Sequence, residues 1–211
     1  MLGQRKIPYR MTSVFPTNIS PELIAELPLR QFTGRIILVD TMELLHDALK
    51  MLSGHTILGF DTETKPSFKK GQINRVSMLQ LSYHDTCFII RLNKVGLCDE
   101  LVHILSSTSI LKVGLSIRDD FRELSRLKHF HPAGFIDLQS YVEDFGILDK
   151  SLKKLSALVM GYRISKSQQT SNWELEHLTE PQLVYAATDA WVCLEIYKKL
   201  KEVEAKFKPQ T

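Results

Sequence analysis

The stretch Ile57-Leu58-Gly59-Phe60-Asp61-Thr62-Glu63 is apolar as far as Phe60 and then ends in two acids. A short apolar run of this kind predicts a buried strand over residues 57–63. Asp61 and Glu63 stand two residues apart, so their side chains project from the same face at the C-terminal end of that strand. An Asp-x-Glu pair alone is weak evidence for a functional site, because such pairs are common on solvated surfaces.

A further acid lies in the stretch Tyr185-Ala186-Ala187-Thr188-Asp189. A helix is predicted over residues 180–205, because Thr179-Glu180-Pro181-Gln182 combines a capping-box pattern with a proline in the first turn. Within this helix Tyr185 and Asp189 are four residues apart, so they share one face. The helix can therefore present a carboxylate and a phenol to the two acids of the strand.

Asp120 is a third acidic position, shortly after a predicted strand at 111–115. On a helix that begins near residue 117, Asp120 and its neighbour Asp119 point about 100° apart, so only one of them can face the sheet. Leu124 shares the face of Asp120, four residues away. This favours Asp120 as the inward acid and Asp119 as the exposed one.

The order of the remaining elements predicts one α/β domain over residues 35–205, preceded by an N-terminal arm at 1–34 with a short helical turn at 21–27. Strands early in the chain and helices late are typical of a mixed sheet flanked by helices. Further strands are expected at 35–40, 76–83 and 87–92, with the last two forming a hairpin. Further helices are expected at 41–53, 99–106, 117–127, 137–145 and 151–160. The apolar face of the first of these consists of Leu44, Leu45, Ala48, Leu49 and Leu52.

Composition narrows the class of protein. A chain of 211 residues with 44% hydrophobic content is sufficient for a single domain with an ample core. No apolar run approaches the roughly 18–20 residues that span a bilayer, so we expect no membrane partner. The N-terminus lacks the apolar core of a secretory signal. Three cysteines without CxxC spacing are typical of reduced thiols in a cytoplasmic protein.

The net charge of +3 does not by itself indicate nucleic-acid binding, but the basic residues are clustered. The run from residue 65 to 75 holds four basic residues and no acid, and it begins two residues after Glu63. We expect Lys69, Lys70 and Arg75 to guide a phosphate backbone toward the acids. The alternative is an idle solvated loop. The other basic clusters are Lys150, Lys153 and Lys154, and Arg163 and Lys166.

Four carboxylates that converge at one sheet edge (Asp61, Glu63, Asp120 and Asp189) would repel one another unless cations neutralise them. An all-oxygen set suits Mg²⁺ or Mn²⁺ rather than zinc. Two such ions about 3.5–4 Å apart are the usual apparatus for displacement at phosphorus. We therefore expect two divalent cations, Mg²⁺ or Mn²⁺, with Tyr185 beside them.

These three motifs together resemble those of the DEDD 3′–5′ exonucleases. The tyrosine suits the DEDDy group, which includes RNase D and the exonuclease domain of the Werner syndrome helicase. The resemblance covers about residues 35–200. The motifs that carry the resemblance are Phe60–Glu63, Gly114–Leu124 and Tyr185–Asp189. The sequence between the motifs is also similar to that family, at Val76–Leu81, Ser151–Leu155 and Ser171–Trp173.

The resemblance implies a ribonuclease-H-like fold and a metal-dependent 3′–5′ exonuclease that releases nucleoside 5′-monophosphates. It implies that Asp61 bridges both cations, that Glu63 and Asp189 complete the first site, and that Asp120 serves the second. Tyr185 would hydrogen-bond the attacking water.

The expected partner is nucleic acid with a single-stranded or recessed 3′ end. The choice between DNA and RNA stays open, as does the oligomeric state. Two alternatives stand beside this prediction: an RNA-trimming ribonuclease of the same chemistry, and a non-catalytic nucleic-acid-binding module that keeps the fold.

Overall fold

A six-stranded mixed sheet forms the centre of the computed structural model, which describes residues 14–67 and 74–207. Its strand order is β1-β4-β3-β2-β5-β6. The β2–β3 and β3–β4 pairs are antiparallel, and the β1–β4, β2–β5 and β5–β6 pairs are parallel. The strands are β1 (Arg35–Val39), β2 (Ile57–Thr64), β3 (Val76–Tyr83), β4 (Thr86–Ile90), β5 (Leu111–Gly114) and β6 (Phe135–Asp137).

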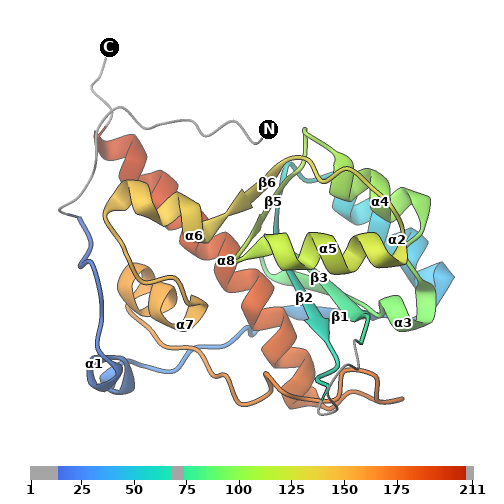
Figure 1. Cartoon of the computed structure of the whole chain (residues 1–211), viewed down its shortest axis with the longest axis horizontal. Coiled ribbons are helices and arrows are strands. Elements are labelled where there is room, and N and C mark those ends of the chain that lie inside the picture. Colours follow the sequence, from blue (N-terminus) through green and yellow to red (C-terminus); the bar gives the residue numbers. More distant parts are fainter. Residues whose placement is uncertain (1–13, 68–73, 208–211) are drawn as a thin grey trace.

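Helices cover both faces of this sheet. One face packs against α2 (Met42–Ser53), α4 (Asp99–Ser106) and α5 (Ile117–Leu127). The other face packs against α8 (Glu180–Phe207), which Figure 1 shows as one long helix crossing the sheet. The shorter elements are α1 (Pro21–Glu26), α3 (Leu92–Val95), α6 (Leu138–Tyr141), the 3₁₀ helix η1 (Val142–Phe145), α7 (Leu152–Leu155) and the π-helical turn η2 (Ser156–Met160).

The start of α8 confirms the predicted capping box. The Thr179 N–H donates to Gln182 Oε1 at 2.9 Å, and the Gln182 N–H donates to Thr179 Oγ1 at 3.4 Å. These reciprocal bonds satisfy two backbone donors that an uncapped helix would leave without partners. They also define the helical register that places Tyr185 and Asp189 on the face toward the sheet.

Gly59 allows α8 to lie directly on β2. A Cβ atom at this position would stand 2.1 Å from the backbone oxygen of Ala190 and 2.4 Å from Ser82 Oγ, so no larger residue fits without a shift of the helix. Because side chains alternate along a strand, Asp61 and Glu63 project to the same face as Gly59. The close contact therefore brings Asp189, the neighbour of Ala190, to the two acids of β2.

Three expectations from the sequence need correction. Only helices were expected after residue 115, but β6 adds a strand at Phe135–Asp137. This strand has three residues, which is too short for an alternating pattern to be visible. The segments 137–145 and 151–160 each begin as an α-helix and continue as a 3₁₀ helix or a π-helical turn. Leu44 is 40% exposed, whereas the other four apolar residues expected on that helix face are buried.

Part of the predicted N-terminal arm packs onto the domain. The Phe32 N–H donates to Thr188 Oγ1 of α8 at 2.9 Å, and the Ile19 N–H donates to an oxygen of Asp149 at 2.9 Å. The side chains of Ile24 and Phe32 are buried. The division at residue 35 stays a prediction. In the part of the chain that the structure describes, none of the helices has the length and apolar content that a bilayer-spanning segment needs.

Candidate active site

Three carboxylates meet where α8 crosses the C-terminal half of β2. One oxygen from each of Asp61, Glu63 and Asp189 lies within 4.8 Å of the others. The parallel pairing between β2 and β5 ends at Gly59. Asp61 and Glu63 therefore lie on the part of β2 that extends beyond its pairing with β5. Oxygen ligands this close together are suited to a hard divalent cation.

Asp120 reaches the same strand from the opposite face. Thr62 lies between the two acids of β2 and therefore points to the side of the sheet that α5 covers. Its hydroxyl donates a hydrogen bond to Asp120 Oδ1. Asp119 is 74% exposed and pairs with Arg122 at 3.0 Å. The structure thus places Asp120 inward and Asp119 in solvent, in the orientation that the helical spacing favoured.

Burial and mutual repulsion make these acids difficult to ionise in the metal-free protein. Burial raises the pKa of Asp61 well above its usual value, and the charges of Glu63, Asp189 and Asp120 raise it further. Burial and the charge of Asp189 raise the pKa of Glu63 to about 8. Burial raises the pKa of Asp120 to about 6, although the Thr62 hydrogen bond opposes this rise.

Asp189 supplies the observation that fits a cation most directly. Burial raises the pKa of its carboxyl, against the opposing charge of Lys166. Its Oδ1 atom is buried and has no hydrogen-bond partner among the described residues. An ionised carboxylate oxygen in such surroundings is costly unless a positive charge meets it. The donor set therefore fits divalent metal at this position.

Tyr185 lies next to the acidic cluster as a buried, neutral phenol. Its side chain is buried, and its ring stacks on that of Trp173, with the centroids 5.8 Å apart. Burial and the negative charge of Asp189 raise the pKa of the phenol above its usual value. The hydroxyl thus keeps its proton at neutral pH, and it can both donate and accept a hydrogen bond.

Lys166 belongs to this site, although in the sequence it falls in a basic cluster with Arg163, away from the acidic motifs. Its Nζ atom donates to Asp189 Oδ2 at 2.6 Å and to Tyr185 Oη at 3.5 Å. It also lies 5.3 Å from the centroid of the Tyr185 ring. Lys166 is in an irregular segment between η2 and α8, where no periodicity indicates the direction of a side chain.

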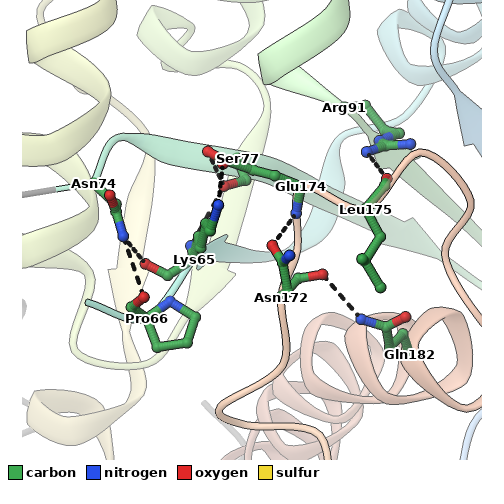
Figure 2. Close-up of polar contacts among 9 residues, drawn as sticks. All are labelled: Lys65, Pro66, Asn74, Ser77, Arg91, Asn172, Glu174, Leu175 and Gln182. Atoms are coloured by element: carbon green, nitrogen blue, oxygen red, sulfur yellow. Dashed lines mark hydrogen bonds and ion pairs between the residues drawn. The ribbon is translucent and has the colours of Figure 1, made fainter. Parts of the chain in front are cut away.

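The segment that carries Lys166 is anchored to the sheet by a buried arginine. Arg91 is fully buried at the end of β4, and its guanidinium donates to the backbone oxygens of Leu175 at 2.5 Å and Glu176 at 2.8 Å. Figure 2 shows this side chain pointing to the loop at Leu175. Asn172 connects the same segment to α8, because its backbone oxygen accepts from Gln182 Nε2 at 3.2 Å.

Glu174 connects this segment to the end of β2 and the start of β3, two central strands of the sheet. Its carboxylate accepts from Lys65 Nζ at 3.1 Å and from Ser77 Oγ at 3.4 Å (Figure 2). Asn74 Nδ2 donates to the backbone oxygens of Lys65 at 2.8 Å and Pro66 at 3.2 Å. Lys65, the first residue of the basic run, is therefore paired with an acid.

The predicted phosphate-guiding residues are only partly described. Lys69 and Lys70 lie outside the described residues, and Arg75 is exposed next to the start of β3. In another basic cluster, Lys150 pairs with Glu143 and Lys154 pairs with Asp149, each at 2.6 Å. The role of Lys69, Lys70 and Arg75 stays a prediction.

Comparison with known proteins identifies the family. The profile of the 3′–5′ exonuclease family matches residues 36–204. The mouse bifunctional 3′–5′ exonuclease/ATP-dependent helicase WRN is 33% identical over 190 residues, which are 82% of this chain and 13% of that protein. A 3′–5′ exonuclease of Arabidopsis thaliana is 30% identical over 199 residues, which cover 83% of this chain and 67% of that protein.

Solved structures agree with this assignment. The Nibbler EXO domain of Aedes aegypti superposes with a TM-score of 0.73 at 25% identity and covers 86% of this chain and 94% of that one. Escherichia coli RNase D has the same fold, with a TM-score of 0.73 at 22% identity over 82% of this chain and 45% of that one. With its six-stranded ribonuclease-H-like sheet and its tyrosine-containing acidic motifs, the chain belongs to the DEDDy-type 3′–5′ exonuclease family.

Proposed function

We propose that this protein is a metal-dependent 3′–5′ exonuclease that hydrolyses nucleic acid to nucleoside 5′-monophosphates. The observation that carries the proposal is the convergence of Asp61, Glu63 and Asp189, with a buried Asp189 oxygen that has no partner among the described residues. A carboxylate cluster that only stabilised the fold would leave this repulsion only partly compensated, by the single charge of Lys166. Membership of the family supports the same reaction.

Four acids would hold the cations. We assign Asp61 as the ligand that both cations would share, because on β2 it adjoins the other acids. One of its oxygens is within 4.8 Å of Glu63 and Asp189, and the next residue, Thr62, bonds to Asp120. Glu63 and Asp189 complete one site, and Asp120, held by Thr62, serves the other. Two divalent cations bound here would supply the positive charge that stabilises the phosphorus centre and the leaving oxygen during displacement.

Tyr185 would position the attacking water. Its phenol remains protonated and is fixed by the stack on Trp173. A phenol oxygen that accepts a hydrogen bond from water orients a lone pair of that water toward phosphorus, without the need for a charged base. Positioning and general acid–base effects of this kind are typically worth about 10²–10⁴ in rate.

The substrate we propose is the 3′ end of a single strand or of a recessed duplex. Mouse WRN and the Arabidopsis thaliana relative are described as 3′–5′ exonucleases, WRN also as a helicase. Escherichia coli RNase D is described as an exoribonuclease involved in structured RNA processing. RNA trimming is therefore the second candidate for this chain. It shares the chemistry and differs only in the sugar that is recognised.

Labelled oligonucleotides test the proposal. Single-stranded DNA, recessed DNA and RNA of equal sequence, each with a 5′ label, are incubated with Mg²⁺ or Mn²⁺. We expect a ladder of labelled products shortened from the 3′ end, and mononucleotide as the only small product when the same reactions are separated by chromatography with ultraviolet detection. Asp61→Asn is the control and should be inactive. Internal cleavage, shortening from the 5′ end, or wild-type turnover by Asp61→Asn would refute the assignment.

A further inference from the structure

The ammonium group of Lys166 contacts a carboxylate oxygen of Asp189, which the proposed function assigns as a metal ligand. The ammonium is 2.6 Å from Asp189 Oδ2, while Oδ1 of the same carboxylate has no partner among the described residues. Lys166 thus neutralises part of the charge of the whole cluster in the metal-free protein.

Once metal is bound, the negative charge of the four acids is neutralised without Lys166. Four ionised carboxylates carry four negative charges, and two divalent cations would balance them. An ammonium held on a ligating carboxylate would then repel the metal at short range, where the solvent screens little. The lysine and a cation therefore compete for Asp189.

The Lys166 side chain has space for a second position, away from Asp189. Lys166 is partly exposed, with 29% of its side chain accessible. Ser165 and Ser167, its two neighbours, line a cavity of about 240 Å³ together with Tyr185. The ammonium already contacts Tyr185 Oη at 3.5 Å, next to the group that would position the attacking water. A lysine on a flexible four-carbon stem can exchange a carboxylate for a phosphate nearby.

We propose that Lys166 is a resident counter-ion of the metal-free enzyme, which divalent cation displaces from Asp189 and which then contacts the phosphate of the substrate. The inference rests on the proposed function. Arg91, Glu174 and Asn172 anchor the segment that follows the lysine to the end of β4, to β3 and to α8. Before the lysine, the backbone of Arg163 bonds to Pro28 at 3.0 Å and to Arg30 at 2.9 Å, so only the side chain needs to move. Lys166 is thereby a competitor of the metal for Asp189 and a contact for the substrate.

Binding of Mn²⁺ alone separates this role from a structural ion pair. In isothermal titration calorimetry without nucleic acid, Lys166→Met should bind Mn²⁺ more tightly than wild type, on the order of tenfold, because a competing charge is gone. Lys166→Arg should bind within about threefold of wild type, because it keeps the charge. Lys198→Met is the matched control: it removes a lysine paired at 2.8 Å with Glu195, farther along α8, and should change nothing.

Thermal unfolding and single-turnover cleavage complete the test. Without metal, Lys166→Met should melt below wild type, and saturating Mn²⁺ should remove that difference, even for a variant that is unfolded without metal. At saturating Mn²⁺ and substrate, Lys166→Met should cleave at least about tenfold more slowly, since a charged contact to the phosphate is lost.

The outcomes distinguish a failure of the proposed exonuclease activity from a failure of the role of Lys166. A wild-type protein that binds no Mn²⁺ and cleaves nothing would refute the proposed function itself. A wild-type protein that binds and cleaves, beside a Lys166→Met variant with equal or weaker Mn²⁺ affinity, would refute only the role of Lys166. A variant that Mn²⁺ fails to refold, or that cleaves at the wild-type rate, would do the same.

Discussion

Replacing Glu63 by glutamine should stabilise the metal-free protein while it abolishes cleavage. Burial and the charge of Asp189 raise the pKa of Glu63 from 4.5 to about 8. The difference of about 3.5 pH units, at about 1.36 kcal/mol each, sets an upper limit of about 5 kcal/mol on the cost of ionising this side chain in the folded state. Because solvent screens a side chain that is not fully buried, we expect a measured gain of about 1–3 kcal/mol for Glu63→Gln.

The sign of the pH dependence follows from proton linkage. A carboxyl whose pKa is raised on folding binds more protons in the native state, so unfolding becomes easier as pH rises. The metal-free wild type should therefore lose stability between about pH 4.5 and pH 8, the two pKa values of Glu63. The glutamine variant lacks this contribution, so its advantage should be small near pH 5 and largest above pH 8.

Urea denaturation in the presence of a chelator, at pH 5, 6.5 and 8, measures the effect. Glu202→Gln is the matched control, because this side chain is 63% exposed and pairs with Lys199. Saturating Mn²⁺ should reverse the order, since bound metal stabilises the native wild type. A Glu63→Gln protein that is no more stable than wild type at pH 8 without metal would show that the acids do not repel one another as argued.

Three other changes test separate parts of the site. Tyr185→Phe should lower kcat by about 10²–10⁴ with little change in Mn²⁺ affinity; an affinity loss as large as that of Asp189→Asn would show that the phenol is not a positioning group. Joint replacement of Lys69 and Lys70 by glutamine should raise KM and flatten the slope of log K against log[salt] by about 0.7–0.9 per lost contact; an unchanged slope would favour the idle loop. Gly59→Ala should cost about 1–3 kcal/mol of stability, because its Cβ would meet the backbone of α8 at 2.1 Å. The control for this last change is Gly54→Ala, whose nearest contact is 3.5 Å, and equal stability of the two variants would contradict the packing argument.

The sequence alone determined the features that depend on neighbours in the chain. Alternation along β2 places Asp61 and Glu63 on one face, and the i,i+4 spacing on α8 pairs Tyr185 with Asp189. The capping box marks the start of α8, and the structure contains it. Such features are readable because backbone geometry alone decides which side chains share a face, whatever the rest of the chain does.

Only the tertiary structure decided which of these faces meet, and at what distance. The contact of α8 with β2 at Gly59 brings Asp189 to Asp61, and it depends on two segments that are far apart in the chain. Lys166 reaches Asp189 from an irregular loop whose path depends on hydrogen bonds to the buried side chain of Arg91. Spacing in sequence carries no information about such contacts, because long-range packing and backbone hydrogen bonds between distant segments decide them.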